Sequence, residues 1–155
     1  MSQATSAPSR LTDYEGVIGA MQGYIDGVLA GRSDLMRPNF HPAASFFGHY
    51  DGTMLAGSAQ ALFDWVDQNG PTPNTRTQFG QIDVRETIAL VRLEMEGVSG
   101  TLSLGGNARL TDFFTLLKTD DRWLITHKTF SLVLTLHPLG TPHSTHGECF
   151  RFITS

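Results

Sequence analysis

A chain of 155 residues, 40% of them hydrophobic, has the length and composition of one domain with a single core. Its formal net charge of -4 gives no electrostatic reason to expect a nucleic acid or an anionic membrane as partner. The apolar runs are shorter than a membrane span and residues 1–10 lack the apolar core of a secretory signal, so we expect a cytoplasmic protein. The single cysteine, Cys149, excludes an internal disulfide and a cysteine-cluster zinc site.

The first half of the chain predicts helices. Residues 1–10, rich in Ser, Ala and Pro, are expected to form a flexible tail. Thr12 followed by Glu15 matches a capping box, and a long amphipathic helix ending at Gly31 is indicated by apolar residues spaced three and four apart: Leu11, Tyr14, Ile18, Met21, Ile25 and Val28. A second stripe predicts that another backbone packs closely against this helix: Gly16, Ala20, Gly23 and Gly27.

Two shorter helices are predicted next. Ser33 is expected to cap a helix over 34–39, which the following prolines end. Ser58 is expected to cap another, which stops at 69–71 and has apolar residues on one face: Ala59, Leu62, Phe63 and Val66.

The remaining segments predict strands. A small hairpin is expected from 43–50 and 53–55, joined by the turn Asp51-Gly52. Four longer strands follow, over 76–86, 88–96, 108–118 and 123–137. The glycine-rich connection 97–107 leads into a strand, so we interpret it as a hairpin loop and not as a phosphate-binding loop.

This order of elements predicts an α+β fold in which three N-terminal helices pack on one face of a strongly curved, mainly antiparallel sheet. The domain is expected to span 11–137, followed by a C-terminal extension over 138–155.

The hairpin of 111–130 is the candidate functional stretch. With a two-residue turn at Asp120-Asp121, Asp112 would lie opposite Thr129 and Phe114 opposite His127. Asp112 and His127 would then be diagonal neighbours on one sheet face. A carboxylate beside an imidazole in a pocket can move a proton to and from a bound molecule.

Several motifs resemble the nuclear transport factor 2-like superfamily of cone-shaped α+β proteins: Tyr24, Gly31-Arg32-Ser33-Asp34, Phe40-His41-Pro42-Ala43-Ala44, the segment 111–118, and Arg122-Trp123-Leu124-Ile125 with Lys128 and Phe130. The last group is most similar to the lumazine-binding branch, and more loosely to SnoaL-type cyclases and ketosteroid isomerases. The resemblance implies a cystatin-like cone, a small-molecule pocket and a homodimer. The superfamily includes isomerases, dehydratases, cyclases and non-catalytic proteins, so the fold does not select the chemistry.

Compared with ketosteroid isomerases, the chain keeps some site residues and lacks others. Tyr24 matches their hydrogen-bonding tyrosine on the first helix, and Asp112 lies on the strand of their second acid, offset along it. Their catalytic aspartate would fall at Gly48, which has no side chain to abstract a proton. Scytalone dehydratase-like chemistry, which uses inward histidines, an aspartate and tyrosines around a dry pocket, fits these residue types better.

The predicted site consists of Asp112 and His127 as acid and base and Tyr24 as a positioning residue. The residues expected to bind substrate are His41, Tyr14, Phe46, Phe114 and Trp123. Structural roles remain as alternatives: Asp112 could accept a hydrogen bond from Tyr24 or a loop amide, and His127 could be satisfied within the sheet.

The sequence therefore leaves two functional hypotheses. The first is a protein that binds a small apolar or carbonyl-bearing molecule and acts as a lyase, isomerase or cyclase without a cofactor. The second is a non-catalytic binding or interaction module. A pocket of about 300 Å³ or more would favour the enzyme and a filled cone the module.

No cofactor or metal is expected, since His143 and His146 lie in a segment with no helix to fix them. A homodimer is expected through the other sheet face, bearing Leu132, Leu134 and Leu136 or their alternates.

Overall fold

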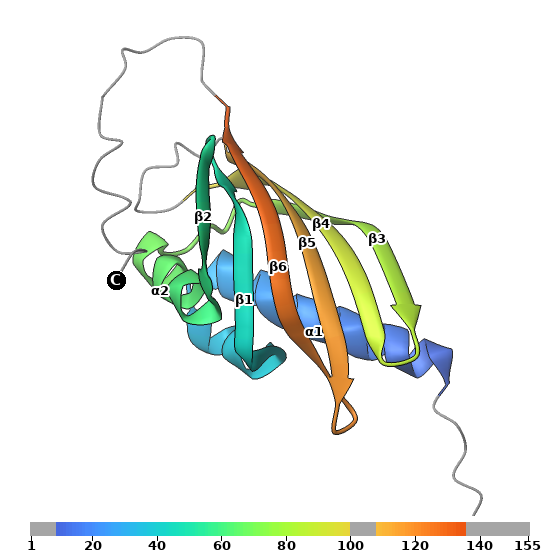
Figure 1. Ribbon diagram of the computed structural model, residues 1–155. Coiled ribbons are helices and arrows are strands. Elements are labelled where there is room, and N and C mark those ends of the chain that lie inside the picture. The colour runs from blue at the N-terminus through green and yellow to red at the C-terminus, as the bar shows by residue number, and fades with distance from the viewer. Residues whose placement is uncertain (1–8, 100–107, 136–155) are drawn as a thin grey trace, which may run out of the picture.

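The computed structural model describes residues 9–99 and 108–135 (Figure 1). The helical elements are α1 (Arg10–Ala30), the 3-10 turns η1 (Ser33–Leu35) and η2 (Arg37–Asn39), and α2 (Ala59–Asn69). The strands are β1 (Phe40–Tyr50), β2 (Thr53–Ser58), β3 (Arg76–Arg85), β4 (Ile88–Val98), β5 (Ala108–Thr119) and β6 (Arg122–Leu134).

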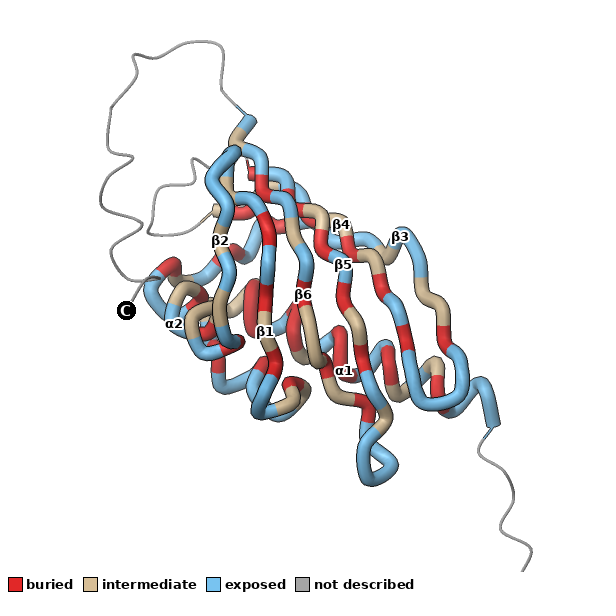
Figure 2. The backbone as a smooth tube through the Cα atoms, viewed as in Figure 1, coloured by how far each residue is buried: buried red, intermediate tan, exposed pale blue. Residues whose placement is uncertain are grey.

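The six strands form one sheet in the order β2-β1-β6-β5-β4-β3. Neighbouring strands are antiparallel except β1 and β6, which are parallel. The sheet curves around α1, which lies along its inner face, while α2 packs near β1 and β2 at one edge (Figure 1). Buried and exposed residues alternate along β4 and β5, as expected for a sheet covered on one face (Figure 2). The predicted α+β architecture is confirmed.

Helix α1 ends where predicted but begins earlier, and it buries part of the predicted apolar stripe. Gly31 has φ +64°, a left-handed conformation that suits glycine at a helix end. The N-terminal cap is Ser9, whose hydroxyl accepts a hydrogen bond from the Leu11 amide at 3.2 Å, so the predicted capping box is wrong. Met21, Ile25 and Val28 of the predicted stripe are buried as expected. Leu11 and Ile18 are exposed, because the buried face of the helix is centred on Val17, Met21 and Tyr24.

The glycine stripe of α1 receives side chains and also backbone. A methyl group at Gly16 would lie 2.6 Å from Cδ1 of Trp123. One at Gly27 would collide with the Met36 side chain and lie 2.9 Å from the Arg32 carbonyl oxygen. The predicted close approach of backbone is therefore present at Gly27, and a bulky side chain fills the space at Gly16.

The second predicted helix is two 3-10 turns, η1 and η2. Pro38 lacks the amide hydrogen that a continuous α-helix would need at that position. The third predicted helix is α2, which begins after Ser58 and buries Phe63 and Val66 as expected.

A β-bulge in β6 changes which residues face the core. Asp120 and Asp121 form the predicted two-residue turn, both with positive φ, and pairing proceeds regularly to Leu116 opposite Ile125. The register then shifts, so that His127 lies opposite Thr115. One extra residue reverses the faces of all residues that follow it.

Beyond the bulge, Phe114 lies opposite Lys128 and Asp112 opposite Phe130. The predicted pairings of Asp112 with Thr129 and of Phe114 with His127 are therefore wrong. The Thr126 hydroxyl stabilises the bulge by donating to the Thr115 carbonyl at 3.1 Å.

The outer sheet face exposes apolar side chains, among them Phe47, Leu90, Phe113 and Val133. Leu132 faces the core and is buried, so its neighbour Val133 occupies the outer face. Leu136 lies outside the described residues.

Among the described helices, none has both the length and the apolar character that crossing a membrane requires. The domain limits at 11 and 137 and the cytoplasmic location remain predictions.

Candidate functional site

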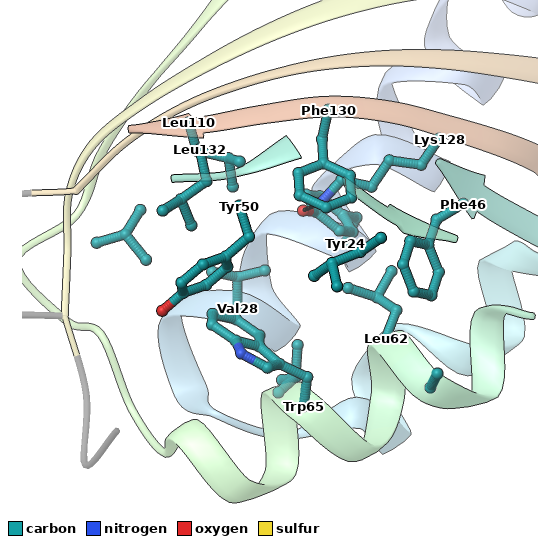
Figure 3. Close-up of a pocket in the computed structure, with 14 residues that line it drawn as sticks. Tyr24, Val28, Phe46, Tyr50, Leu62, Trp65, Leu110, Lys128, Phe130 and Leu132 are labelled. Carbon is teal, nitrogen blue, oxygen red and sulfur yellow. Dashed lines mark hydrogen bonds between the residues drawn. The ribbon is translucent and has the colours of Figure 1, made fainter. Parts of the chain in front are cut away.

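Three polar side chains meet inside the core, one from each of α1, β5 and β6. Tyr24, Asp112 and Lys128 have exposed fractions of 1%, 0% and 4%. The Lys128 and Tyr24 side chains end beside each other, next to the Phe130 ring (Figure 3). Tyr24 lies one turn from the buried Met21 on α1, and Lys128 lies two residues from Phe130, which packs against the core, on β6. Residues at these spacings share a face, so both side chains point inward.

Hydrogen bonds order the three groups. The Lys128 Nζ donates to the Tyr24 Oη at 2.8 Å, and the Tyr24 Oη donates to the Asp112 Oδ2 at 2.9 Å. The same Nζ lies 3.1 Å from Asp112 Oδ1, to which no described residue donates a hydrogen bond of good geometry. The hydrogen-bonded path from amine to carboxylate therefore passes through the tyrosine hydroxyl. The alternative in which Asp112 accepts a hydrogen bond from Tyr24 is confirmed.

Burial shifts the pKa of each of the three groups in the direction that favours its neutral form. It raises the pKa of Asp112, against the opposing attraction of Lys128. It lowers the pKa of Lys128, against the opposing attraction of Asp112. Burial, helped by the Asp112 charge, raises the pKa of Tyr24 well above its ordinary value, so the hydroxyl keeps its proton.

Aromatic rings surround the lysine amine. Its Nζ lies 5.2 Å from the centre of the Tyr24 ring, 5.1 Å from that of Phe130 and 6.0 Å from that of Phe114. The faces of such rings attract a cation. The rings thus favour the ammonium form, in opposition to desolvation.

An apolar cavity of about 50 Å³ opens beside this cluster, between α2 and the sheet (Figure 3). Its walls include Phe46, Leu62 and Trp65, and Tyr24 and Lys128 of the cluster also line it. It has room for a few water molecules, since one needs roughly 10–15 Å³. It is smaller than the pocket that would by itself favour an enzyme, because side chains fill much of the space.

His127, the predicted base, lies on the outer face of the sheet. Its Nδ1 is 2.9 Å from the Ser45 hydroxyl and its Nε2 is 3.1 Å from the Thr129 hydroxyl. The bulge separates it from Asp112, so the predicted juxtaposition of carboxylate and imidazole is wrong. His127 is satisfied within the sheet, as its structural alternative proposed.

The residues predicted to bind substrate are dispersed. Phe46 lines the cavity, and Phe114 packs edge-on against Tyr24 with ring centres 4.8 Å apart. His41 accepts a hydrogen bond from the Ala43 amide at 3.0 Å and is not among the cavity residues.

Trp123 and Tyr14 lie near the N-terminal end of α1. The Trp123 indole donates to Asp13 at 3.2 Å, and Lys118 donates to the same carboxylate oxygen at 2.8 Å. Tyr14 borders a separate surface cavity of about 310 Å³ together with Arg10. Neither aromatic residue reaches the cluster around Lys128.

Lys128 is the functional candidate that sequence reasoning missed. Counting forward from Ile125 places it on the outer face, whereas counting back from Phe130 and Leu132 places it on the inner face. The conflict between these two counts was the available signal for a bulge.

At Gly48, where the catalytic aspartate of ketosteroid isomerases would fall, there is no space for a side chain. A methyl group there would collide with the backbone and the ring of Phe130. The ring that borders the cavity therefore takes the place of that base.

Among residues 9–99 and 108–135, no three His, Cys, Asp or Glu side chains are grouped to hold a metal ion. His143 and His146 lie outside this part of the chain.

Comparisons with known proteins agree with the fold. The family model described as "Putative lumazine-binding" matches residues 12–131. The chain is 29% identical over 119 residues to the aldolase FrzH of Cladobotryum sp., covering 77% of this chain and 90% of that protein. An NTF2-like protein from Shewanella baltica shares 27% identity at a TM-score of 0.72, covering 86% of this chain and 100% of that one. One from Methylobacillus flagellatus shares 28% at 0.72, covering 83% and 98%.

Proposed function

The chain belongs to the lumazine-binding family of the nuclear transport factor 2-like superfamily, and we propose that it is a cofactor-independent enzyme that binds a small apolar carbonyl compound and moves a proton at the neighbouring carbon. Lyases, isomerases and cyclases share this step.

The observation that carries the proposal is the buried chain of Lys128, Tyr24 and Asp112 at the edge of an apolar cavity. Buried ionisable groups with shifted pKa values are costly to keep and gather at functional sites. An apolar cavity with a few convergent polar groups suits a small ligand with one polar end.

The cluster offers both parts of acid–base chemistry. A carbonyl oxygen in the cavity would lie near the Tyr24 hydroxyl, which keeps its proton. As negative charge develops on that oxygen, the hydroxyl can donate its hydrogen bond to it in place of Asp112. Lys128 lines the cavity and is neutral when its own proton passes through Tyr24 to Asp112. Its amine can then take up the proton that leaves the adjacent carbon. One relative is named an aldolase, and aldol reactions include a proton transfer next to a carbonyl group, which supports the class of reaction.

The test follows exchange of the methyl hydrogens of acetophenone for deuterium by NMR in heavy water. We expect the wild type to accelerate exchange and Tyr24→Phe to lose about a hundredfold of that acceleration, the scale of one acid–base group. Lys118→Met removes the lysine outside the site and should retain the wild-type rate.

The cavity's part in binding can be checked separately. Leu62→Trp would fill the cavity from α2 and should abolish the thermal stabilisation that acetophenone gives, whereas Ile18→Trp on the exposed face of α1 should not. Exchange no faster than the buffer rate for any of a panel of small aldehydes and ketones would contradict the enzymatic proposal.

The second candidate function is a non-catalytic binding module, favoured by the small volume of the cavity. It predicts that ligands stabilise the protein without any exchange, so the same two measurements separate the candidates.

We also propose that the protein forms a homodimer through its outer sheet face and that it is located in the cytoplasm. The exposed side chains of Phe47, Leu90 and Phe113 support this, since a contiguous apolar surface is covered in most soluble proteins. Phe113→Lys should yield a monomer in light-scattering measurements.

A further inference from the structure

We propose that Lys128 is a nucleophile, which forms an imine with the carbonyl carbon of an aldehyde or ketone in the cavity. This inference rests on the proposed function, because it requires a carbonyl compound in the same cavity.

The position of the amine suits this role. The Lys128 side chain borders the cavity although only 4% of its surface is exposed. A ligand in the cavity can therefore meet the amine while bulk water is kept away. The apolar walls, which include Phe46 and Trp65, would protect an imine from hydrolysis.

A nucleophilic lysine must first lose its proton, and the cluster provides the acceptor. Moving one proton from Lys128 to the Tyr24 oxygen, while the Tyr24 proton passes to Asp112, converts two buried ions into two neutral groups. The net charge does not change, and burial favours the neutral pair. The aromatic rings and the mutual attraction of the ions favour the charged pair, so they act in the opposite direction to burial.

The reaction balances with groups that are present. The amine lone pair attacks the carbonyl carbon, a C–N bond forms, and the electrons of the C=O double bond move to oxygen. The nitrogen gives one proton to that oxygen through the Tyr24 hydroxyl, which produces a carbinolamine.

Asp112, now a carboxylic acid, supplies the second proton through Tyr24, and the hydroxyl group leaves as water. The products are an iminium on Lys128, a carboxylate on Asp112 and one water molecule, with no oxidation or reduction. The iminium charge lies where the ammonium charge was, near Asp112 and the rings of Phe130 and Phe114.

The test is reductive trapping of the full protein with benzaldehyde and sodium cyanoborohydride, read by intact mass and peptide mapping. The chain has two lysines, Lys118 and Lys128, which makes the assignment direct. We expect one benzyl group, located on Lys128 before Lys118 or the N-terminal amine reacts. Lys118→Met should retain this label and Lys128→Met should lose it.

Lys128→Arg is a second variant, which keeps the positive charge but lacks a nucleophilic amine. Circular dichroism shows whether Lys128→Met and Lys128→Arg are folded. If either folded Lys128 variant still takes up the first label at the wild-type rate, the inference is wrong.

The outcomes separate the inference from the proposed function. If benzaldehyde stabilises the wild type but labels only Lys118 or the N-terminus, the imine is excluded while binding in the cavity stands. If Lys128 is labelled and no hydrogen exchange is catalysed, the nucleophile is supported and the proposed activity is wrong. If neither stabilisation nor labelling of Lys128 occurs and no member of the carbonyl panel undergoes exchange, both are wrong.

Discussion

Two groups of similar composition lie at different places along α1. In the first, which we call the core cluster, Asp112 and Lys128 meet the hydroxyl of Tyr24. In the second, the rim cluster, Asp13 and Lys118 meet the indole of Trp123. Each combines a carboxylate, a lysine amine and an aromatic hydrogen-bond donor.

The clusters differ in depth. The aspartate and lysine side chains are 0% and 5% exposed in the core cluster, and 12% and 16% exposed in the rim cluster. In the rim cluster the hydrogen bond from Lys118 outweighs desolvation, so the pKa of Asp13 is lowered. In the core cluster desolvation outweighs Lys128, so the pKa of Asp112 is raised. The direction of the aspartate pKa shift is thus reversed between a side chain that is 12% exposed and one that is 0% exposed. Only the core cluster has groups whose charge is readily given up.

The largest expected difference concerns removal of the carboxylates. Asp112→Ala leaves a buried lysine without its counter-ion and should lower the free energy of unfolding by about 3–5 kcal/mol. Asp13→Ala should lower it by less, since water reaches Lys118. Urea denaturation of both variants measures the difference.

Asp112→Leu combined with Lys128→Met removes both buried ions and should recover most of that loss. Equal losses of unfolding free energy in Asp112→Ala and Asp13→Ala would show that depth does not distinguish the clusters.

The next effect concerns the aromatic donors. Tyr24→Phe leaves Asp112 and Lys128 each without a hydrogen bond and should cost about 1–3 kcal/mol of unfolding free energy. Trp123→Phe should cost less at the rim cluster, because Lys118 still donates to Asp13. Thermal and urea unfolding of this matched pair gives the comparison, and a larger loss for Trp123→Phe would contradict it.

The smallest effect is the pH dependence of stability, which should have opposite signs. The lowered pKa of Asp13 gives a contribution present above about pH 3.9 and lost as the pH falls through the folded-state pKa. The raised pKa of Asp112 gives a contribution present below about pH 3.9 and lost as the pH rises through the folded-state pKa.

Unfolding of the wild type, Asp13→Asn and Asp112→Asn between about pH 3 and pH 7 measures both slopes. The stability difference from wild type should grow with pH for Asp13→Asn and shrink for Asp112→Asn. If the stability differences of the two variants changed with pH in the same direction, the opposite pKa shifts of Asp13 and Asp112 would be contradicted.

Local patterns were sufficient to predict much of the fold. The end of α1 at Gly31, the hairpin turns at Asp51-Gly52 and Asp120-Asp121, and the strands from 76 onward follow from turn residues and alternation, and the structure has them. The first turn of α1 was predicted less well, because Ser9 caps the helix in place of Thr12. The 3-10 turns were predicted as one helix, which Pro38 interrupts.

The candidate site was half predictable. Asp112 was identified as a carboxylate on an apolar hairpin and Tyr24 from the resemblance to ketosteroid isomerases, and the structure places them in contact. His127 was paired with them and Lys128 was missed, because the register was counted without a bulge.

The sequence by itself determined the fold class, the family resemblance and the turn that begins the central hairpin, since these depend on residues close together along the chain. Only the tertiary structure decided which ionisable residue faces Asp112. One extra residue at the bulge exchanges the two faces of β6 and so brings Lys128, not His127, to the cavity. The packing of the sheet around α1 then decided that this lysine is buried, and burial gives it the chemistry proposed above.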